Sequence, residues 1–499
     1  MDFPHGLAGS RRPRRAVSSA VAALAGALAL LPAAVAAQDV PGPVPSTPFS
    51  EAELDGIDFV FHDLDRTDTP GCAVGVVVDG RLAFADGYGS ANLDHEIPIT
   101  PQTVFYMGSV SKQFTAGAVA LAAREGHLSL DDDVREWFPE LPDYGDTIRV
   151  RHLVHHTSGI RDYLTLQGIT GSYEGTTDEQ IIDLLARQEG LNFAPGEREL
   201  YSNSGYFLLS ELVERATGMT LREYGEARWF GPLGMRNSHF HDDADHIVRY
   251  RATAYSPEGR GFQMNHAWGF AQVGSGGLYS NIVDMARWEA VFADDRMGAP
   301  GLRADLLERG VLSGGDTLDY AFGISHGSYR GVPTLSHSGS LAGFRTGVIR
   351  FPEQATSILV FCNESNAGPM DRARAVADRL LGAALAPAST EEEEAAPQAA
   401  GQTPDPQAPP TLSSEERAAF VGTYHSPELQ GELEVAREDA GLVLVRRDGG
   451  LRELEPTAAD AFAAGNYRLT FVRDGEGEVS GFVLDTGRAN GIVFHRVVE

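Results

Sequence analysis

Strand-like runs flank a long helical stretch in this sequence, and this order constrains the fold more than any other feature. Residues 72–79 and 81–89 read as two strands, and the Asp79-Gly80 pair between them is typical of a tight hairpin turn. Three more strand-like runs cover residues 334–340, 343–351 and 356–362. In such a chain, the strands from the two ends of the domain pair in one sheet, and the helices between them pack on that sheet. We therefore expect an α/β (α+β) fold, with an antiparallel sheet flanked by helices and a helical subdomain.

Apolar residues recur at helical spacing between the two sets of strands. In residues 111–125, Phe114, Ala118 and Leu121 have core spacing, and Gly126 ends the predicted helix. Thr176 and Glu179 form a capping box that predicts the start of another helix. The remaining predicted helices cover residues 203–217, 281–292 and 370–385.

The first 37 residues have the composition of a signal peptide. Four arginines between positions 11 and 15 precede an Ala/Leu/Val run, and small residues at 35–37 are followed by polar Gln38. We expect segment 1–37 to be removed and the protein to be exported to the periplasm or secreted, without a membrane span in its mature form. An uncleaved membrane anchor is the alternative, because the apolar run is about long enough to cross a bilayer.

Composition also divides the rest of the chain. The α/β domain is expected over residues 48–385. Residues 386–411 are rich in Pro and Ala and contain the acidic run Glu391–Glu394, which predicts a disordered, solvated linker. Residues 412–499 contain short alternating runs separated by Gly and Asp turns, so we expect a small all-β, barrel-like domain there. Its predicted strands cover residues 432–436, 442–446, 467–472, 479–484 and 492–497.

The charge balance and the cysteine count exclude several classes of function. The chain has 40 basic and 70 acidic residues, a net charge of −30, so its field repels nucleic acid and a nucleic-acid partner is excluded. Cys72 and Cys362 are the only cysteines, too few for a zinc cluster. Both lie in strand-like runs. Two buried free thiols are the default expectation, and a disulfide between them is the alternative.

Lys112 is the only lysine among those 40 basic residues. An ammonium can lose its proton when buried, whereas a guanidinium stays charged, so a lone lysine among arginines indicates acid/base chemistry. Ser109 stands three positions before Lys112, at the predicted start of a helix, so both side chains project from one face. This is the geometry of a hydroxyl nucleophile with an amine base. The base role requires the lysine pKa to fall by roughly 3 units from about 10.4.

Two other segments carry polar groups suited to the same chemistry. Tyr201-Ser202-Asn203 precedes a predicted helix and offers a phenol that can relay a proton and an amide that can hold a substrate carbonyl. His337-Ser338-Gly339-Ser340 lies on a predicted strand, where the glycine would let a substrate backbone lie close.

Together these motifs resemble the serine β-lactamase and penicillin-binding protein superfamily, most closely the branch of class C β-lactamases, DD-carboxypeptidases, D-aminopeptidases and esterases. The resemblance covers about residues 48–385. The matching segments are Met107–Phe114, Tyr201–Asn203 and His337–Gly339, with His156–Gly159 and Gly276–Ser280 as framework segments. It implies a β-lactamase-like fold for this domain.

The resemblance also implies a role for each residue. Ser109 would be the acylated nucleophile, Lys112 its base, and Tyr201 the shuttle that protonates the leaving group. The backbone amides of Ser109 and Ser340 would form the oxyanion hole, and Asn203 would orient the substrate amide. No metal or organic cofactor is expected. The partner would be a small-molecule or peptide substrate, and the oligomeric state is left open.

The third motif departs from the β-lactamase pattern. That pattern has Lys-Thr-Gly on this strand, whereas this chain has His337-Ser338-Gly339. His337 can donate to a substrate carboxylate or to the Tyr201 oxygen, but its charge depends on pH. The change favours a D-amino-acid peptidase, a carboxypeptidase-like enzyme or an esterase, with a β-lactamase as the alternative. Arg345 would be a plain surface arginine or a second carboxylate ligand.

Other features of the sequence allow alternatives to a serine mechanism. Residues 239–246 contain three His and three Asp, a metal-ligand character, but Ala244 interrupts the metallo-hydrolase pattern and a solvated acidic loop is expected. His152, His155 and His156 are expected to structure a helix end. The third alternative is a catalytically silent ligand-binding or sensor protein, in which the barrel-like domain would be the functional part.

Overall fold

The computed structural model describes residues 47–171, 175–267, 269–294, 299–387, 412–438, 441–446 and 449–498. The predicted signal peptide and nearly all of the predicted linker lie outside the described residues. Within the described ranges, no helix combines the length and the apolar character needed to cross a membrane.

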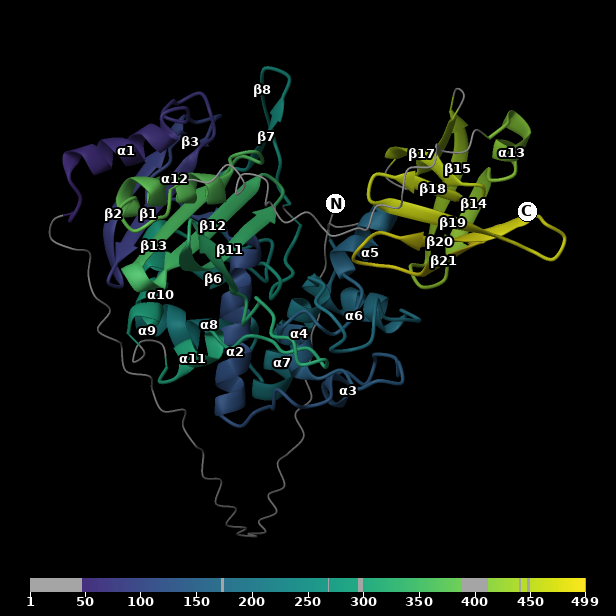
Figure 1. The fold of residues 1–499 in the computed structure, drawn as a ribbon, viewed down its shortest axis with the longest axis horizontal. Helices are drawn as coiled ribbons and strands as arrows, with labels where there is room; N and C mark the ends of the chain where they lie inside the picture. Colours follow the sequence, from purple (N-terminus) through teal and green to yellow (C-terminus); the bar gives the residue numbers. More distant parts are fainter. Residues whose placement is uncertain are drawn as a thin grey trace, which may run out of the picture. The chain divides into compact units, whose positions relative to one another are not determined.

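A six-stranded antiparallel sheet in the order β10-β11-β12-β13-β1-β2 forms the centre of the α/β domain (Figure 1). The first two strands of this sheet pair with the last ones, as the sequence predicted, because β1 lies between β2 and β13. The prediction missed β10, whose residues Ser-His-Gly-Ser-Tyr show no apolar alternation. The strands are β1 (Cys72–Val78), β2 (Arg81–Tyr88), β10 (Ser325–Tyr329), β11 (Val332–Leu341), β12 (Phe344–Phe351) and β13 (Thr356–Cys362).

Helices cover both faces of this sheet. On one face, α1 (Glu51–Phe61) and α12 (Pro369–Leu381) pack side by side and bury an apolar layer that includes Ile57, Val74 and Ile349 (Figure 1). On the other face, α10 (Ile282–Ala293) packs on β1 and β2. Burial of apolar side chains on both faces, at about 25 cal/mol per Å², stabilises this three-layer arrangement.

The helical subdomain surrounds α2, whose residues from Lys112 to Ala120 are all buried. One predicted boundary here is wrong by one residue: Thr177 and Gln180 form the capping box of α6, while the Thr176 hydroxyl accepts from Gln167 at 3.1 Å. The helices are η1 (Gly108–Ser111), α2 (Lys112–Arg124), α3 (Val134–Trp137), α4 (Val150–Val154), α5 (Tyr163–Thr170), α6 (Asp178–Ala186), α7 (Asn203–Thr217), α8 (Leu221–Gly225), η2 (Glu226–Phe230), α9 (Gly231–Leu233) and α11 (Leu302–Leu306).

Short strands and one further turn complete the α/β domain. They are β3 (Ser90–Asn92), β4 (Ile97–Pro98), β5 (Phe105–Tyr106), β6 (His239–Phe240), β7 (Tyr255–Glu258), β8 (Gly261–Met264), β9 (Leu278–Ser280) and η3 (Pro352–Gln354). Strand β9 pairs with β5 and β6, so it joins the segment before Ser109 to the helical part of the chain.

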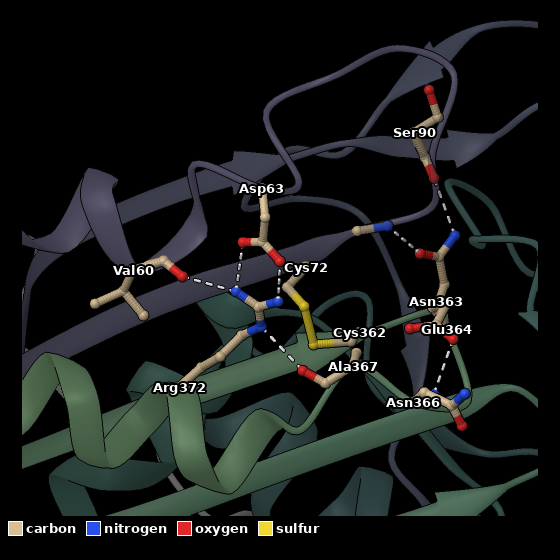
Figure 2. The surroundings of a disulfide bond; sticks show 11 residues. Val60, Asp63, Cys72, Ser90, Cys362, Asn363, Glu364, Asn366, Ala367 and Arg372 are labelled. Atoms are coloured by element: carbon tan, nitrogen blue, oxygen red, sulfur yellow. Dashed lines mark hydrogen bonds and ion pairs between the residues drawn. A yellow bond between two sulfur atoms is a disulfide. The ribbon is translucent and has the colours of Figure 1, made fainter.

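Cys72 and Cys362 form a disulfide, so the default expectation of two free thiols is wrong (Figure 2). The two residues stand directly opposite each other where β1 and β13 pair, although 290 positions separate them in the sequence. Beside the bond, Arg372 of α12 donates to both carboxylate oxygens of Asp63, at 2.9 and 2.6 Å, and to the Val60 carbonyl at 2.7 Å (Figure 2). The disulfide therefore lies in a part of the domain that is also tied by polar contacts.

The C-terminal residues form a closed eight-stranded barrel in which consecutive strands pair and β14 closes on β21. Aromatic residues fill its interior, among them Tyr424, Phe471 and Phe482. The sequence predicted five of the eight strands and missed β14, β17 and β18. The elements are α13 (Ser414–Ala418), β14 (Gly422–Ser426), β15 (Gly431–Glu438), β16 (Gly441–Val445), β17 (Leu451–Ala458), β18 (Ala461–Ala464), β19 (Tyr467–Arg473), β20 (Val479–Asp485) and β21 (Ile492–Arg496).

Candidate active site

Ser109 lies in the 3₁₀ turn η1, and Lys112 is the first residue of α2. The helix predicted from residue 111 starts at Lys112, one residue later, and Ser109 lies in the 3₁₀ turn before it instead of in the regular helix. Gly108 has a φ of +54°, and a Cβ at this position would overlap the backbone nitrogen of Ser340. Only glycine allows the turn before Ser109 to lie against β11 in this way.

The Lys112 ammonium nitrogen is fully buried and has three polar neighbours. Its Nζ lies 2.6 Å from the Ser275 carbonyl oxygen, 2.9 Å from Asn203 Oδ1 and 3.3 Å from Ser109 Oγ. The two shorter contacts are to atoms that can only accept hydrogen bonds. In the neutral amine, its two N–H groups therefore bind Ser275 and Asn203, and the lone pair faces the Ser109 hydroxyl.

Electrostatics favour this neutral amine. Burial lowers the pKa of Lys112 well below its ordinary value, and the charge of Arg488 lowers it further. The carboxylate of Asp162 acts in the opposite direction and raises the pKa. The direction of the net shift is the one that a base role requires.

Asp162 is a site residue that the sequence analysis missed. It caps α5, since its Oδ1 accepts from the Thr165 amide at 2.9 Å. Its Oδ2 accepts from the backbone nitrogen and from Nδ2 of Asn203, at 2.6 and 2.9 Å. The Asn203 side chain contacts both Lys112 and Asp162, and its role in orienting a substrate amide stays a prediction. The only signal for Asp162 in the sequence was an acidic residue before a helix, which is typical of an N-cap.

Tyr201 lies beside Lys112, with Nζ 4.7 Å from the centre of its ring. Its hydroxyl is buried and has no hydrogen-bond partner of standard geometry among the described residues. Burial raises the pKa of Tyr201 above its ordinary value, and the nearby Ser109 hydroxyl partly offsets that shift. The phenol therefore keeps its proton at neutral pH. His156 packs against its ring at 4.3 Å and accepts from the Ser202 amide at 3.1 Å, which fixes the turn before α7.

His337 is buried on β11 and is held by two neighbours. Its Nδ1 lies 2.7 Å from the Ser338 carbonyl, which can only accept, so Nδ1 carries the proton. Its Nε2 then accepts from the Tyr320 hydroxyl at 3.1 Å. Burial lowers the pKa of His337 to about 4. The ring is therefore neutral near pH 7. Tyr320 was not among the predicted site residues.

Gly339 is required by the protein's own backbone. A Cβ at this position would overlap the Met107 carbonyl oxygen and the Thr346 hydroxyl. Thr346 Oγ1 donates to that same carbonyl at 2.8 Å, so β11 and β12 hold the segment before Ser109. This packing brings Ser340 next to the turn that carries Ser109. Whether a substrate backbone also approaches Gly339 stays a prediction.

The remaining candidate residues have structural contacts. Arg345 donates to the carbonyls of Ala342 and Phe344, at 2.8 and 2.7 Å, and thus caps its own hairpin. In the His/Asp segment, Asp242 accepts from Arg222 at 2.8 Å, and His246 lies 3.3 Å from the same guanidinium. Within the described ranges, no group of three or more His, Cys, Asp or Glu has metal-binding geometry.

A buried network of polar side chains contacts α2 at Gln113, the residue after Lys112. Arg350 forms a two-point ion pair with Glu289 and donates to Gln113 Oε1 at 2.8 Å. The Trp288 indole donates to the same oxygen, also at 2.8 Å. These contacts join α2 to α10 and β12, and so fix the helix that begins at Lys112.

Comparison with known proteins gives a family and several relatives. A family model described as Beta-lactamase matches residues 57–383. A D-aminopeptidase of Cereibacter sphaeroides is 30% identical over 343 residues, which cover 67% of this chain and 63% of the relative. The match therefore spans less than two thirds of that relative's own length. Penicillin-binding protein 4* of Bacillus subtilis is 28% identical over 301 residues, covering 57% of this chain and 66% of that protein.

Solved structures show the same fold. The octameric penicillin-binding protein homologue from Pyrococcus abyssi has a TM-score of 0.59 at 22% identity, covering 86% of this chain and 95% of its own. The D-amino acid amidase from Ochrobactrum anthropi has a TM-score of 0.56 at 21% identity, covering 66% of this chain and 98% of its own. With the family model covering well over half of the sequence, the chain belongs to the Beta-lactamase family.

Proposed function

We propose that this protein is an exported serine hydrolase that cleaves an amide or ester bond through an acyl-enzyme on Ser109. The observation that carries the proposal is the buried Lys112 amine, whose two acceptor contacts direct its lone pair at the Ser109 hydroxyl. A buried amine with a lowered pKa is a suitable general base for a serine nucleophile.

In the proposed acylation step, Ser109, Lys112 and Tyr201 act in turn. Ser109 Oγ attacks the substrate carbonyl carbon while its proton moves to Lys112 Nζ. The backbone N–H groups of Ser109 and Ser340 stabilise the oxyanion that forms. When the carbon–nitrogen or carbon–oxygen bond breaks, Tyr201 donates its proton to the leaving group and regains one from the Lys112 ammonium. The products of this step are a free amine or alcohol and an ester on Ser109.

Deacylation uses the same groups in reverse. A water molecule gives a proton to Lys112 through Tyr201 and attacks the ester carbonyl. The bond to Ser109 Oγ then breaks, and the serine regains its proton from Lys112. The net reaction consumes one water and releases a carboxylic acid, and the enzyme returns to its starting state.

Two observations favour a D-amino-acid amide or peptide, or a simple ester, as the substrate. The relatives include proteins named D-aminopeptidase and D-amino acid amidase. In addition, His337 is neutral near pH 7, so this strand offers no fixed positive charge in place of the lysine of β-lactamases.

The disulfide between Cys72 and Cys362 supports export, because such bonds persist in oxidising compartments.

The test is a substrate panel on the wild type and on Ser109→Ala. The panel contains D-alanyl peptides and their L epimers, nitrocefin, and p-nitrophenyl esters. We expect turnover of D-alanyl peptides or esters, little hydrolysis of nitrocefin, and a loss of at least about 10³-fold in Ser109→Ala. Ser328→Ala, an exposed serine on β10, is the matched control and should keep full activity.

A covalent probe separates turnover from simple binding. A fluorescent penicillin or phosphonate should label the wild type and Ser328→Ala but not Ser109→Ala. Activity that survives in Ser109→Ala would refute the nucleophile. A wild type that is neither labelled nor active on any substrate would instead favour the ligand-binding role.

A further inference from the structure

A loop of the barrel lies against the candidate active site. Among the described residues, the loop 486–491 between β20 and β21 contacts the α/β domain. The carbonyl oxygen of Arg488 accepts from the Asp162 amide and from Asn192 Nδ2, both at 3.0 Å. The Asn490 amide donates to Asn192 Oδ1 at 2.9 Å. The loop is therefore fixed at Arg488 and again two residues later.

The loop is also ordered by its own side chains. Asn490 Oδ1 accepts from the amides of Thr486 and Gly487, at 3.2 and 3.0 Å. Thr486 Oγ1 donates to the Ala489 carbonyl at 2.9 Å, and Asp485 accepts from the Gly491 amide at 2.7 Å. Such a loop presents the Arg488 side chain at low cost in conformational entropy.

A buried ion pair anchors the barrel beside this loop. Arg161 Nη1 lies 2.6 Å from Glu428 Oε2, and the two side chains are only 4% and 3% exposed. Arg161 Nη2 also donates to the Gly491 carbonyl at 3.2 Å. Arg161 immediately precedes Asp162, so one short segment of the α/β domain holds the loop, Asn203 and, through Asn203, the Lys112 amine.

The Arg488 guanidinium has no bonded partner in the part of the chain that the structure describes. Its carbon lies 5.0 Å from the centre of the Tyr201 ring, the side chain is exposed, and its five N–H donors make no hydrogen bond or ion pair to a described residue. By contrast, many other arginines of this acidic protein are paired with carboxylates, as Arg350 is with Glu289. Arg488 thus places an unneutralised cation, from a loop whose backbone is fixed, beside the proposed proton shuttle.

We propose that Arg488 is a specificity-determining residue that binds a carboxylate of the substrate. The inference rests on the proposed function, because it assigns a substrate class to the same site. A guanidinium binds a carboxylate through two parallel N–H···O bonds, and such charge-assisted bonds are the strong ones. A substrate with a free ammonium at this position would be repelled by the same charge. The preferred substrate is therefore an acidic D-amino-acid derivative, in which the carboxylate lies on the leaving group or on the acyl side.

The experiment compares substrates that differ only in that charge. One pair tests the leaving group: an N-acylated D-alanyl-D-alanine with a free carboxylate and the same compound as its C-terminal amide. The other pair tests the acyl side: N-succinyl- and N-acetyl-D-alanyl p-nitroanilide. For each pair, the ratio of kcat/KM for the anionic substrate to kcat/KM for the neutral one is measured in the wild type and in variants.

In the wild type, the ratio should exceed 1 in one pair. Arg488→Gln should lower that ratio by about 10–100-fold, mainly through a higher KM, as expected for the loss of charged hydrogen bonds. Arg488→Lys should retain part of it, because it keeps the charge but not the planar fork. Arg468→Gln, which removes another exposed barrel arginine, is the matched control and should leave both ratios unchanged.

The outcomes separate this inference from the proposed function. Turnover of neutral substrates through Ser109 without any preference for the carboxylate overturns the role of Arg488 alone. An equal loss on anionic and neutral substrates in Arg488→Gln also overturns it, because that pattern indicates a structural role. Absence of turnover and of labelling at Ser109 overturns the proposed function itself.

Discussion

Two cationic residues lie beside the Tyr201 ring, one from the α/β domain and one from the barrel, and their settings are opposite. Lys112 is fully buried and has three polar neighbours, whereas Arg488 is exposed and lies 5.0 Å from the ring centre without a hydrogen bond to a described residue. Burial can turn an ammonium into a neutral base, but it cannot do the same for a guanidinium. The comparison indicates different roles for the two residues: the lysine would act as the base, and the arginine would select the substrate.

The largest effect should come from replacing Lys112 by arginine, the residue type found on the other side of the Tyr201 ring. Lys112→Arg should lower kcat/KM by about 10³-fold or more, because a guanidinium cannot release its proton to act as a base. Steady-state kinetics on the best substrate of the panel measures this. Near-full turnover in the variant, with an unchanged circular dichroism spectrum and melting temperature, would contradict the base role.

The attachment of the barrel loop should be the next most sensitive feature. Glu428→Ala leaves Arg161 buried without its partner and should lower the free energy of unfolding by about 3 kcal/mol. Asp460→Ala breaks an exposed pair with Arg473 on the same barrel and should cost less than about 1 kcal/mol. Urea unfolding measures both values. If the two variants lose equal stability, the ion pair does not anchor the loop.

The sequence predicted the role of Lys112, whereas it gave no indication that Arg488 lies near the site. Ser109 and Lys112 are three residues apart, so local geometry alone brings them together, and the three motifs pointed to the correct family. Arg488 is nearly 380 positions away from Lys112, on a loop whose sequence resembles any polar turn. Closure of the barrel, the Arg161–Glu428 pair and the hydrogen bonds of the loop to Asp162 and Asn192 bring it to Tyr201.

Other misses have the same physical origin. Cys72 and Cys362 face each other only because β1 and β13 are neighbours, and strand pairing at that distance leaves no local signal. Asp162 reads as an ordinary helix cap until α5 and α7 pack together. Strands β14 and β17 were missed because their apolar alternation is weak, and closure of the barrel determines their pairing.

The pH dependence of activity should distinguish the two neighbours that act on Lys112. Activity requires the neutral amine, so kcat/KM should rise with pH through the pKa of Lys112, which burial places well below the ordinary range of lysine. Asp162→Asn removes a charge that raises this pKa and should move the rise to lower pH. Arg488→Gln removes a charge that lowers it and should move the rise to higher pH.

A pH profile of kcat/KM on a neutral substrate, from about pH 4 to 10, measures both shifts and avoids titration of the substrate. Arg468→Gln should leave the profile in place. Shifts of the same sign in Asp162→Asn and Arg488→Gln would show that the group seen in the profile is not Lys112.

The smallest expected effect is that of chelation. Asp242 and His246 in the His/Asp segment contact Arg222, and the proposed reaction uses only the side chains around Ser109. Incubation with EDTA followed by dialysis should leave kcat/KM unchanged. A loss of activity that added zinc restores would assign the chemistry to a metal and would contradict the roles given to Lys112 and Arg488.

The disulfide between neighbouring strands also has a consequence for biosynthesis. Cys72 must wait for 290 further residues before Cys362 exists, which takes on the order of 15–60 s at a translation rate of about 5–20 residues per second. Throughout that time the nascent β1 has β2 on one side and an open apolar edge on the other, a surface prone to aggregation. We therefore expect the emerging polypeptide to need protection from aggregation until β13, the last strand of the sheet, has left the ribosome, and the disulfide cannot form before that point.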